Sequence, residues 1–422
     1  MQRAHVVGAG LAGLSAALRL AQAGVGVTLY EAASHAGGRC RSFIDPKLDC
    51  VIDNGAHLML SGNGEVANFL DLTGGASEII TAPRARFDFL NAANNQRWAV
   101  DLGDGQGRLS VLLSLLRAHN RPPGVSAWTL FRDLNALKSG QTKTVAACVA
   151  GSAAYEPFWH PLTVAVLNAE PDEAAASLLW RVLADTALKG GTFARPLLTR
   201  SGLGAALIEP ALTTLAGLGV DVRLSTRVQA VECVDGRVAS LSLSSGVEVL
   251  GTGDLVVLAV PHFAVDDVVE GLSVPAVSRA ILNVHYQLPQ PSAAPAMTGL
   301  INSPAQWVFV RGSIASVTVS AADAWMDLDA DAIAQKLWPD VAKVLGAKVL
   351  GEDGDVPPNR VIKERRATFA QTLDAQALRP QAATAYANLT LAGDWTATDL
   401  PATIEGALKS GRLAAEAALA TA

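Results

Sequence analysis

The sequence predicts an α/β fold in which a second, α+β domain is interleaved with the first. At the N-terminus, a short apolar strand, a glycine-rich turn and a helical pattern follow one another within residues 4–23. Near the C-terminus, residues 389–407 again combine a short strand, a turn and a helix. Between these ends the hydrophobic period changes from that of strands to that of helices and back. A chain of 422 residues is also longer than most single cores, so we expect two domains.

Composition and charge argue against a nucleic-acid partner. Half of the residues are hydrophobic, 17% are charged, and the net charge is −6. No run of lysine and arginine could follow a phosphate backbone. We therefore expect no binding to nucleic acid.

The spacing of the cysteines and the length of the apolar segments indicate in which compartment the protein works and how it can contact a membrane. The four cysteines have neither CxxC nor zinc-like spacing, which predicts no disulfide framework, no metal site and a cytoplasmic setting. The apolar residues 6–30 are interrupted by glycines and by Arg19, as is typical of a strand, a turn and a helix. We expect any membrane contact to be peripheral, on the inner face of the cytoplasmic membrane.

The N-terminal glycines have the spacing of a dinucleotide-binding turn. Gly8 permits a tight turn after the strand, Gly10 lets the backbone approach a pyrophosphate, and Gly13 lets the helix pack closely on the strand. The N–H groups at the helix N-terminus are then available to phosphate oxygens. A purely steric use of these glycines is the alternative.

Two further features favour a Rossmann-like domain. Glu31 ends a second predicted strand 18 residues after Gly13, near the spacing expected of a carboxylate that binds a ribose hydroxyl. A second glycine-rich turn follows at Gly37 and Gly38, and Arg39 brings a cation toward the same phosphates. The alternative interpretation of Arg39 is a solvated surface charge.

The middle of the chain is predicted to leave this domain and to return to it. We assign 1–80, 200–272 and 385–422 to the cofactor domain, and 81–199 and 273–384 to a substrate-binding domain. The long segment from Thr81 to Arg200 has mostly helical periodicity.

One helical stretch in this segment has two interpretations. Leucines recur at i, i+3, i+4 and i+7, at positions 109, 112, 113 and 116. We interpret them as core of the substrate domain. The alternative is an amphipathic surface that contacts a membrane, flanked by Arg108 and Arg117 and followed by Trp128 and Phe131.

The C-terminal segment has the features of the other half of a nucleotide site. The predicted strand at 389–391 leads to Gly393 and Asp394, and Asp394 is suited to ribityl or ribose hydroxyls. We expect Pro401 to open a helix that carries Thr403 and Ile404, whose N-terminus points its dipole at an anionic cofactor ring. A turn role for Asp394 and a capping role for Thr403 are the alternatives.

Together these motifs resemble those of one family of FAD-dependent enzymes. In chain order they are Gly37-Gly38-Arg39, Asp53-Asn54-Gly55 with His57, Phe158-Trp159-His160-Pro161 with Leu167-Asn168, Arg366-Ala367-Thr368-Phe369, and Ala392-Gly393-Asp394-Trp395-Thr396 with 401–407. The set resembles the squalene-associated FAD-dependent hydroxysqualene dehydroxylases, relatives of phytoene desaturase in the amine oxidase superfamily. The resemblance spans nearly the whole chain and implies an FAD-binding domain of the glutathione reductase and amine oxidase type. Ala56 departs from it, because relatives commonly carry a larger residue there.

The resemblance implies that reduced FAD donates hydride while hydroxysqualene loses its hydroxyl, giving squalene in hopanoid or triterpenoid biosynthesis. An allylic hydroxyl leaves poorly unless it is protonated, so an acid near the alcohol and an apolar, water-excluding tunnel are expected. The resemblance also implies that Gly55 lies beside the flavin ring and Val228 against adenine.

Our candidates for polar groups near the reacting carbon are His57 and Asn168. A histidine that only hydrogen-bonds its own turn is the alternative for His57. Weaker candidates are Glu405, His160 and His262.

Three other functions stay open. A carotenoid or other polyene desaturase uses such a site in the oxidising direction, which product analysis separates. A flavin amine oxidase releases peroxide from an amine, and the aromatic content of 5% does not suggest its ring cage. A non-catalytic scaffold for isoprenoids binds FAD without a redox change. The expected ligand is a hydrophobic isoprenoid, and with no second nicotinamide fingerprint the sequence identifies no electron donor.

Overall fold

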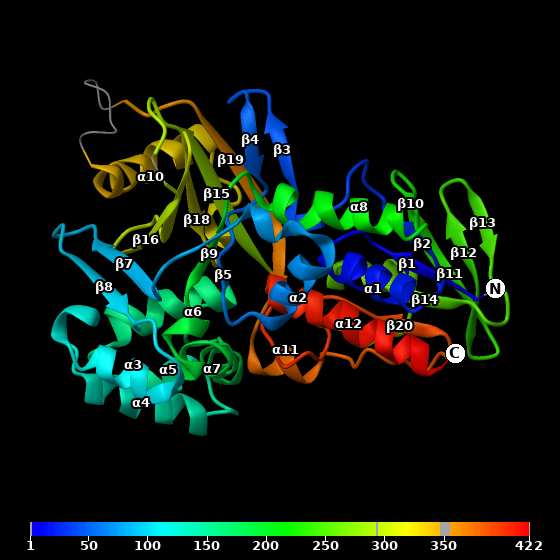
Figure 1. Cartoon of the computed structure of the whole chain (residues 1–422), viewed down its shortest axis with the longest axis horizontal. Helices are drawn as coiled ribbons and strands as arrows, with labels where there is room; N and C mark the ends of the chain where they lie inside the picture. Colours follow the sequence, from blue (N-terminus) through cyan, green and yellow to red (C-terminus); the bar gives the residue numbers. More distant parts are fainter. Residues whose placement is uncertain (1, 293, 347–354, 422) are drawn as a thin grey trace.

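The computed structural model describes residues 2–292, 294–346 and 355–421, and its central element is a five-stranded parallel sheet (Figure 1). The strand order is β10 (Asp221–Arg223), β2 (Gly26–Tyr30), β1 (Arg3–Val7), β14 (Leu255–Leu258) and β20 (Leu389–Leu391). Every pairing in this sheet is parallel. The central strands are buried on both faces, which explains their continuous apolar runs. The sheet thus brings both ends of the chain into one layer, as predicted.

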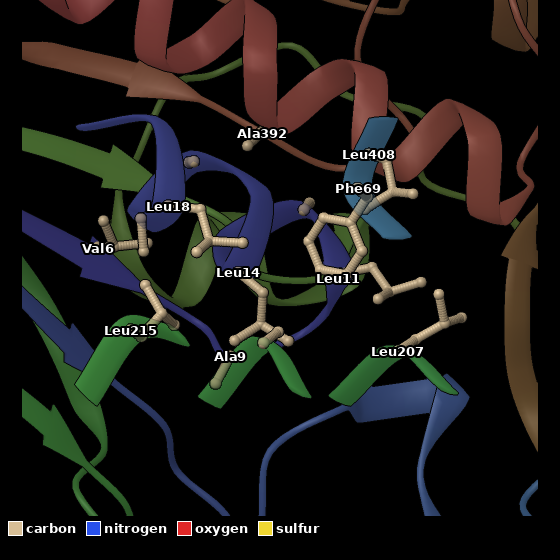
Figure 2. Close-up of a cluster of buried hydrophobic side chains, with 14 of the residues drawn as sticks. Val6, Ala9, Leu11, Leu14, Leu18, Phe69, Leu207, Leu215, Ala392 and Leu408 are labelled. Atoms are coloured by element: carbon tan, nitrogen blue, oxygen red, sulfur yellow. The ribbon is translucent and has the colours of Figure 1, made fainter. Parts of the chain in front are cut away.

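Helices from distant parts of the sequence pack on this sheet and on one another. They are α1 (Leu11–Gln22), α2 (Gly64–Thr73), α8 (Glu209–Gly217) and α12 (Ile404–Ala420). The helices α1 and α12 run side by side (Figure 1). Figure 2 shows Leu14 and Leu18 of α1 within the apolar core that α8 and α12 complete. Burial of each such leucine contributes about 1.5–3 kcal/mol to the free energy of folding. This core therefore holds α1 and α12 on the sheet.

A second, seven-stranded sheet belongs to the other part of the molecule. Its order is β19 (Asn359–Phe369), β15 (Ser278–Gln287), β18 (Ile314–Val319), β17 (Trp307–Arg311), β16 (Ala296–Ile301), β7 (Arg86–Asn91) and β8 (Arg97–Asp101). Only β16 and β7 pair in parallel. One face packs on α10 (Ala330–Leu345), where Tyr286 contacts Trp338. The alternation of strand side chains leaves the other face to a cavity described below.

Residues 86–101 correct one prediction. We predicted mostly helical structure from Thr81, whereas β7 and β8 form an antiparallel hairpin there. Alternating apolar residues, such as Phe87 and Phe89, fit a strand of period 2. The helices start later, with α3 (Gly107–Leu115), α4 (Ala127–Ser139), α5 (Val145–Val149), α6 (His160–Leu167) and α7 (Ala176–Asp185).

The leucines of the α3 region correct a second prediction. We interpreted Leu109, Leu113 and Leu116 as core, but all three are exposed. The residues that α3 buries include Val111 and Leu115. Helical periodicity identified one face of the helix, but this face points to solvent.

Smaller elements complete the molecule. They are the hairpin β3 (Ser42–Asp45) and β4 (Cys50–Asp53), the sheet of β11 (Val228–Val234), β12 (Arg237–Leu243) and β13 (Gly246–Val249), the sheet of β5 (Met59–Leu60), β9 (Pro196–Thr199) and β6 (Ile79–Thr81), and the short helices α9 (Val265–Val268) and α11 (Leu373–Ala377). The five-stranded sheet draws on ranges that we assigned to the cofactor domain, and the seven-stranded sheet on the other ranges. The domain boundaries themselves stay a prediction. Across the described part of the chain, no helix has both the length and the apolar character needed to cross a membrane.

Candidate active site

A cavity of about 1180 Å³ extends from the carboxyl ends of the five-stranded sheet to α3, α4 and α6. Pockets for small molecules usually measure about 300–1000 Å³, so this one has room for a large ligand. In open α/β sheets, ligands bind at the carboxyl ends of the strands. Apart from Gly13, every cofactor-binding residue predicted from the sequence lines this cavity, as do the two catalytic candidates His57 and Asn168. The roles of these residues stay predictions.

The first glycine turn forms one wall of the cavity. The N–H of Gly8 donates to the carbonyl of Tyr30 at 2.8 Å, with a φ of +107° that favours glycine. A Cβ on Gly13 would lie 1.8 Å from the carbonyl oxygen of Gly8, so Gly13 packs beneath the turn. A Cβ on Gly10 would meet no described atom within 4 Å, and no side chain of the described residues caps α1 there. The N-terminus of α1 is therefore accessible to a phosphate.

The carboxylate of Glu31 is held at the end of β2 by backbone donors. One oxygen accepts from the N–H of Ala9 at 2.9 Å, and the other accepts from the N–H of Ala33 at 2.8 Å. A carboxylate oxygen accepts more than one hydrogen bond, and Glu31 lines the cavity, so a ribose hydroxyl can also donate to it. Val228 lines the same end of the cavity at the start of β11 and is buried, as an adenine contact requires.

The second glycine turn packs against the first. The N–H of Gly37 donates to the carbonyl of Ala9 at 2.8 Å, and a Cβ on Gly38 would lie 3.6 Å from the Cα of Gly10. The following Arg39 pairs with Asp394 at 2.8 Å and 2.9 Å and also donates to the carbonyl of Ala367. We predicted that Arg39 faces the phosphates. The structure gives it the carboxylate of Asp394 as a partner, so Arg39 connects the N-terminal and C-terminal halves of the site.

The C-terminal motif supplies another part of the cavity wall. Gly393 and Asp394 follow β20, and Gly393 has a φ of +150°, within the range that favours glycine. The hydroxyl of Thr403 accepts from the N–H of Gly406 at 3.1 Å, so Thr403 caps α12 and lines the cavity at the same time. We expected Pro401 to open this helix, but α12 begins at Ile404 because Thr403 is its cap.

Arg379 binds the backbone of this motif, and the sequence analysis did not identify it as a site residue. It is buried and donates to the carbonyls of Asp394, Thr396 and Leu400 at 2.8–3.1 Å. Burial lowers the pKa of Arg379 to about 10, which leaves it charged at pH 7. No local motif marks this residue, since its partners are backbone carbonyls 15 to 21 positions away.

The imidazole of His57 lines the cavity and has no hydrogen-bond partner among the described residues. Burial lowers the pKa of His57 to about 4, with Arg39 acting in the same direction and Asp53 opposing it. The side chain is therefore neutral at pH 7. A neutral imidazole offers one N–H donor and one acceptor to a ligand.

The side chain of Asn168 is already engaged. It ends α6 in a left-handed conformation with a φ of +48°. Its amide donates to the hydroxyl of Thr368 at 2.9 Å, and its oxygen accepts from the N–H of Ala321 at 2.7 Å. These bonds tie the end of α6 to β19 and to the loop after β18, and they leave little hydrogen-bonding capacity for a ligand. The geometry favours a positioning role over direct chemistry.

A polar band near His57 includes residues that sequence reasoning missed. We use "polar band" for Asn54, His57, Asn283 and Glu364, all of which line the cavity. The amide of Asn54 lies 3.4 Å from a carboxylate oxygen of Glu364. Asn283 accepts from the hydroxyl of Thr318 at 2.9 Å, and its amide nitrogen would lie 3.0 Å from a Cβ on Gly55. The signal for Glu364 was its strand spacing to Arg366 and Thr368, which line the same cavity.

Beyond the polar band the cavity becomes an apolar arm. Six aromatic side chains line it: Phe87, Phe89, Phe158, Trp159, Trp307 and Phe309. Phe89 contacts Trp307 edge to face at 5.5 Å between ring centroids. The low aromatic content did not suggest such a cluster, because composition averages over the whole chain and these rings gather in one place.

The weaker candidates have structural partners. The carboxylate of Glu405 accepts from two backbone N–H groups at the start of α2, at 2.9 and 3.0 Å, and so caps that helix. His262 is buried outside the cavity lining, where its ring lies 2.9 Å from the hydroxyl of Ser278. His160 pairs with Glu170 at 2.9 Å, and both side chains are substantially exposed.

Comparison with known proteins agrees with this geometry. Residues 11–419 match the family described as flavin containing amine oxidoreductase. The chain is 40% identical to the hydroxysqualene dehydroxylase of Rhodopseudomonas palustris, over 99% of this chain and 98% of the relative. It is 35% identical to the hydroxysqualene dehydroxylase of Zymomonas mobilis, over 99% of both chains.

Solved structures share the fold. A putative protoporphyrinogen oxidase from an Exiguobacterium species is 14% identical, with a TM-score of 0.68 over 99% of this chain and 98% of that chain. A triple mutant of putrescine oxidase is 16% identical, with a TM-score of 0.69 over 100% of this chain and 99% of that chain. At these identities the similarity is one of fold alone.

Proposed function

This chain belongs to the flavin-containing amine oxidoreductases and, within them, to the hydroxysqualene dehydroxylases, and from this premise we propose that it reduces hydroxysqualene to squalene in hopanoid biosynthesis. FAD is its cofactor. The observation that carries the proposal is the continuity of one cavity, which joins the nucleotide walls, the polar band and the aromatic arm. A hydrocarbon chain and a dinucleotide can meet there at the polar band.

The residues of the cavity fit FAD. The open space at Gly10 and the N-terminus of α1 suit the pyrophosphate, and Glu31 suits a ribose hydroxyl. Asp394 is positioned for the ribityl chain by Arg39. The N-terminus of α12 suits the electron-rich end of the reduced ring.

The reaction breaks one C–O bond and forms one C–H bond, and the oxygen leaves as water after taking up a proton. When bound in its reduced form, FAD supplies the hydride. His57, as a neutral imidazole, donates a hydrogen bond to the departing hydroxyl. Glu364 is the carboxyl group of the polar band and our candidate for the proton donor. Asn168 positions the wall behind them through Thr368.

The aromatic arm has two tasks in this proposal. Its apolar walls hold the isoprenoid chain and exclude water, which would recapture a carbon that carries positive charge. The faces of its rings also tolerate such charge through their quadrupoles. Both tasks suit a long, apolar isoprenoid as the substrate.

We place the protein in the cytoplasm, in peripheral contact with the inner face of the cytoplasmic membrane. Hydroxysqualene and squalene partition into a bilayer, because each buried CH₂ group contributes about 0.8 kcal/mol. A peripheral contact brings the cavity to the substrate.

The test is a single turnover of the FAD-loaded protein. The bound flavin is reduced without oxygen, hydroxysqualene is added, and flavin absorbance and squalene are followed together, with squalene identified by mass spectrometry. We expect one squalene per flavin oxidised. A flavin that stays reduced while no squalene forms would refute the proposal and favour a polyene desaturase, which the oxidised protein would reveal by becoming reduced on addition of a polyene.

A further inference from the structure

The helices α3 and α4 carry an unusual set of exposed apolar side chains. Leu109, Leu113, Leu116 and Trp128 are 66%, 56%, 56% and 76% exposed. We call these four residues the α3–α4 face. Single exposed apolar residues are ordinary, but several on adjacent helices mark a surface that contacts something apolar.

Arg121 holds the two helices together at this face. Its guanidinium donates to the carbonyls of Leu115 and Leu116 at the end of α3, at 2.7 and 2.8 Å. It also donates to the carbonyl of Val125, just before α4, at 2.7 Å. Arg121 therefore connects the end of α3, where Leu116 lies, to the segment that leads into α4, the helix that carries Trp128. Both helices lie at the same end of the molecule in Figure 1.

The charge around this face is opposite to that of the whole chain. The chain has a net charge of −6. In contrast, residues 107–138 contain five basic side chains, at positions 108, 117, 121, 132 and 138, and one acidic side chain, Asp133. Asp133 is buried, accepts from the indole N–H of Trp159 at 2.8 Å and pairs with Arg132 at 3.1 Å. The other four basic side chains therefore carry the positive charge of this region. Exposed arginines beside leucines and a tryptophan suit an anionic phospholipid surface.

The inner sides of the same helices line the cavity. Val111 and Leu115 of α3 and Leu130 and Leu134 of α4 contribute to its walls near the aromatic arm. The helices α3 and α4 thus form a single layer, with the apolar arm on its inner side and the α3–α4 face on its outer side.

We propose that the α3–α4 face docks the protein on the surface of an anionic phospholipid membrane. Leu109, Leu113 and Trp128 enter the interfacial layer, and Arg108 and Arg117 contact phosphate groups. The isoprenoid then passes from the bilayer into the apolar arm beside these helices. This last step rests on the proposed reaction, whereas docking specifies the surface for the membrane contact proposed above and does not depend on the reaction.

Vesicle co-sedimentation of the full FAD-loaded chain tests the docking without any substrate. We expect the protein to sediment with vesicles of phosphatidylglycerol and phosphatidylcholine, and at least tenfold less with phosphatidylcholine alone or in 0.5 M NaCl. The double variant Leu113→Glu/Trp128→Glu should lower partitioning into anionic vesicles at least tenfold. Its flavin spectrum and Tm should match those of the wild type, because neither residue lines the cavity.

A matched control uses exposed apolar residues elsewhere. Val247 and Val249 of β13 are 65% and 77% exposed and lie at the opposite end of the molecule (Figure 1). The variant Val247→Glu/Val249→Glu introduces the same charge and should bind vesicles as the wild type does. Equal binding by the α3–α4 variant and the wild type, or no sedimentation of the wild type with anionic vesicles, would overturn the docking proposal. Squalene formation from detergent-dispersed substrate, measured separately, reports on the proposed function alone.

Depth-dependent quenching gives a second measurement. The protein has eight tryptophans, so the fluorescence of the wild type is compared with that of Trp128→Phe in vesicles that contain brominated lipid. We expect quenching in the wild type that Trp128→Phe largely loses. Quenching that is identical in both proteins would place the contact elsewhere and contradict the proposal.

Discussion

The guanidinium of Arg39 and the carboxylate of Asp394, 355 positions apart in the chain, form a two-point ion pair with N–O distances of 2.8 and 2.9 Å. The pair joins the second glycine turn to the turn after β20, so it sets the spacing of two walls of the FAD site. We predict that Arg39→Ala weakens FAD binding roughly 10- to 100-fold, because Asp394 is left buried without its charged partner. Flavin fluorescence during titration of the apoprotein measures this Kd.

The pair between Arg84 and Asp101 is a matched control. It has similar geometry and exposure, with side chains 43% and 6% exposed against 36% and 5% for Arg39 and Asp394, but neither residue lines the cavity. Arg84→Ala should lower Tm without changing the Kd for FAD. Equal FAD affinity in Arg39→Ala and wild type would show that the pair is structural only.

The unpartnered imidazole of His57 gives a prediction for catalysis. His57→Gln should lower the single-turnover rate of squalene formation roughly 100-fold while FAD stays bound, because a donor to the leaving hydroxyl is misplaced. With a pKa of about 4, His57 should contribute no change in rate between pH 6 and 8. His160→Gln, outside the cavity, serves as the control and should react as the wild type does. A rate within threefold of wild type for His57→Gln would remove this residue from the mechanism.

Glu364 and Glu405 both line the cavity, and we expect substitution by glutamine to affect the rate at one and the stability at the other. Glu364→Gln keeps an amide partner for Asn54 but cannot transfer a proton, so we expect a roughly 100-fold lower rate with unchanged Tm. Glu405→Gln should lower Tm, because Glu405 caps α2, and leave the rate nearly unchanged. Rapid-mixing kinetics and thermal unfolding distinguish the two. The reverse pattern would assign the proton to Glu405.

The nucleotide half of the site was predictable from the sequence because its constraints are local. Glycines at fixed offsets, two short apolar strands and an acid at a strand end specify β1, α1 and β2 to within a few residues. Strand spacing could have placed Glu364 on the cavity face, but not its contact with Asn54, 310 positions away. Arg379 binds backbone carbonyls, which no local pattern marks. The exposed Leu109 and Leu113 illustrate a related limit, since periodicity reveals a helix face but not the medium that it meets.

Asn168 illustrates how the sequence can identify a residue while leaving its task open. The motif predicted a residue near the reacting carbon, and Asn168 does line the cavity. Its hydrogen bonds to Thr368 and to the backbone of Ala321 involve residues more than 150 positions later in the chain. Only the three-dimensional arrangement shows that its amide is already in use.

Three buried histidines predict that acid destabilises the protein. Burial lowers the pKa values of His57, His262 and His285 to about 4 each, below the value of about 6.5 in the unfolded chain. Between these values the unfolded state binds more protons, so stability is full above pH 6.5 and falls as the pH drops toward 4. At pH 5.5 we expect a loss of about 1 kcal/mol per histidine relative to pH 7.5.

Urea unfolding at the two pH values measures this loss. The variant His262→Asn should lose about 1 kcal/mol of the pH dependence, since it removes one of the histidines whose pKa burial lowers. His119→Asn, which replaces an exposed histidine, should retain all of it. Identical free energies of unfolding at both pH values would contradict the assignment.

Gly411 of α12 gives a prediction about how packing controls the site. A Cβ at this position would lie 2.1 Å from the carbonyl oxygen of Ala12 in α1, a backbone atom that cannot rotate away. Gly411→Ala must therefore push apart two helices whose N-termini both face the cavity. We expect a loss of about 1–3 kcal/mol in the free energy of unfolding and weaker FAD binding.

Gly217→Ala in α8 is the control, because its Cβ would meet no described atom within 4 Å. There the added methyl should be neutral or slightly stabilising. If Gly411→Ala lowered stability but left the Kd for FAD unchanged, the spacing of α1 and α12 would not determine the shape of the cofactor site.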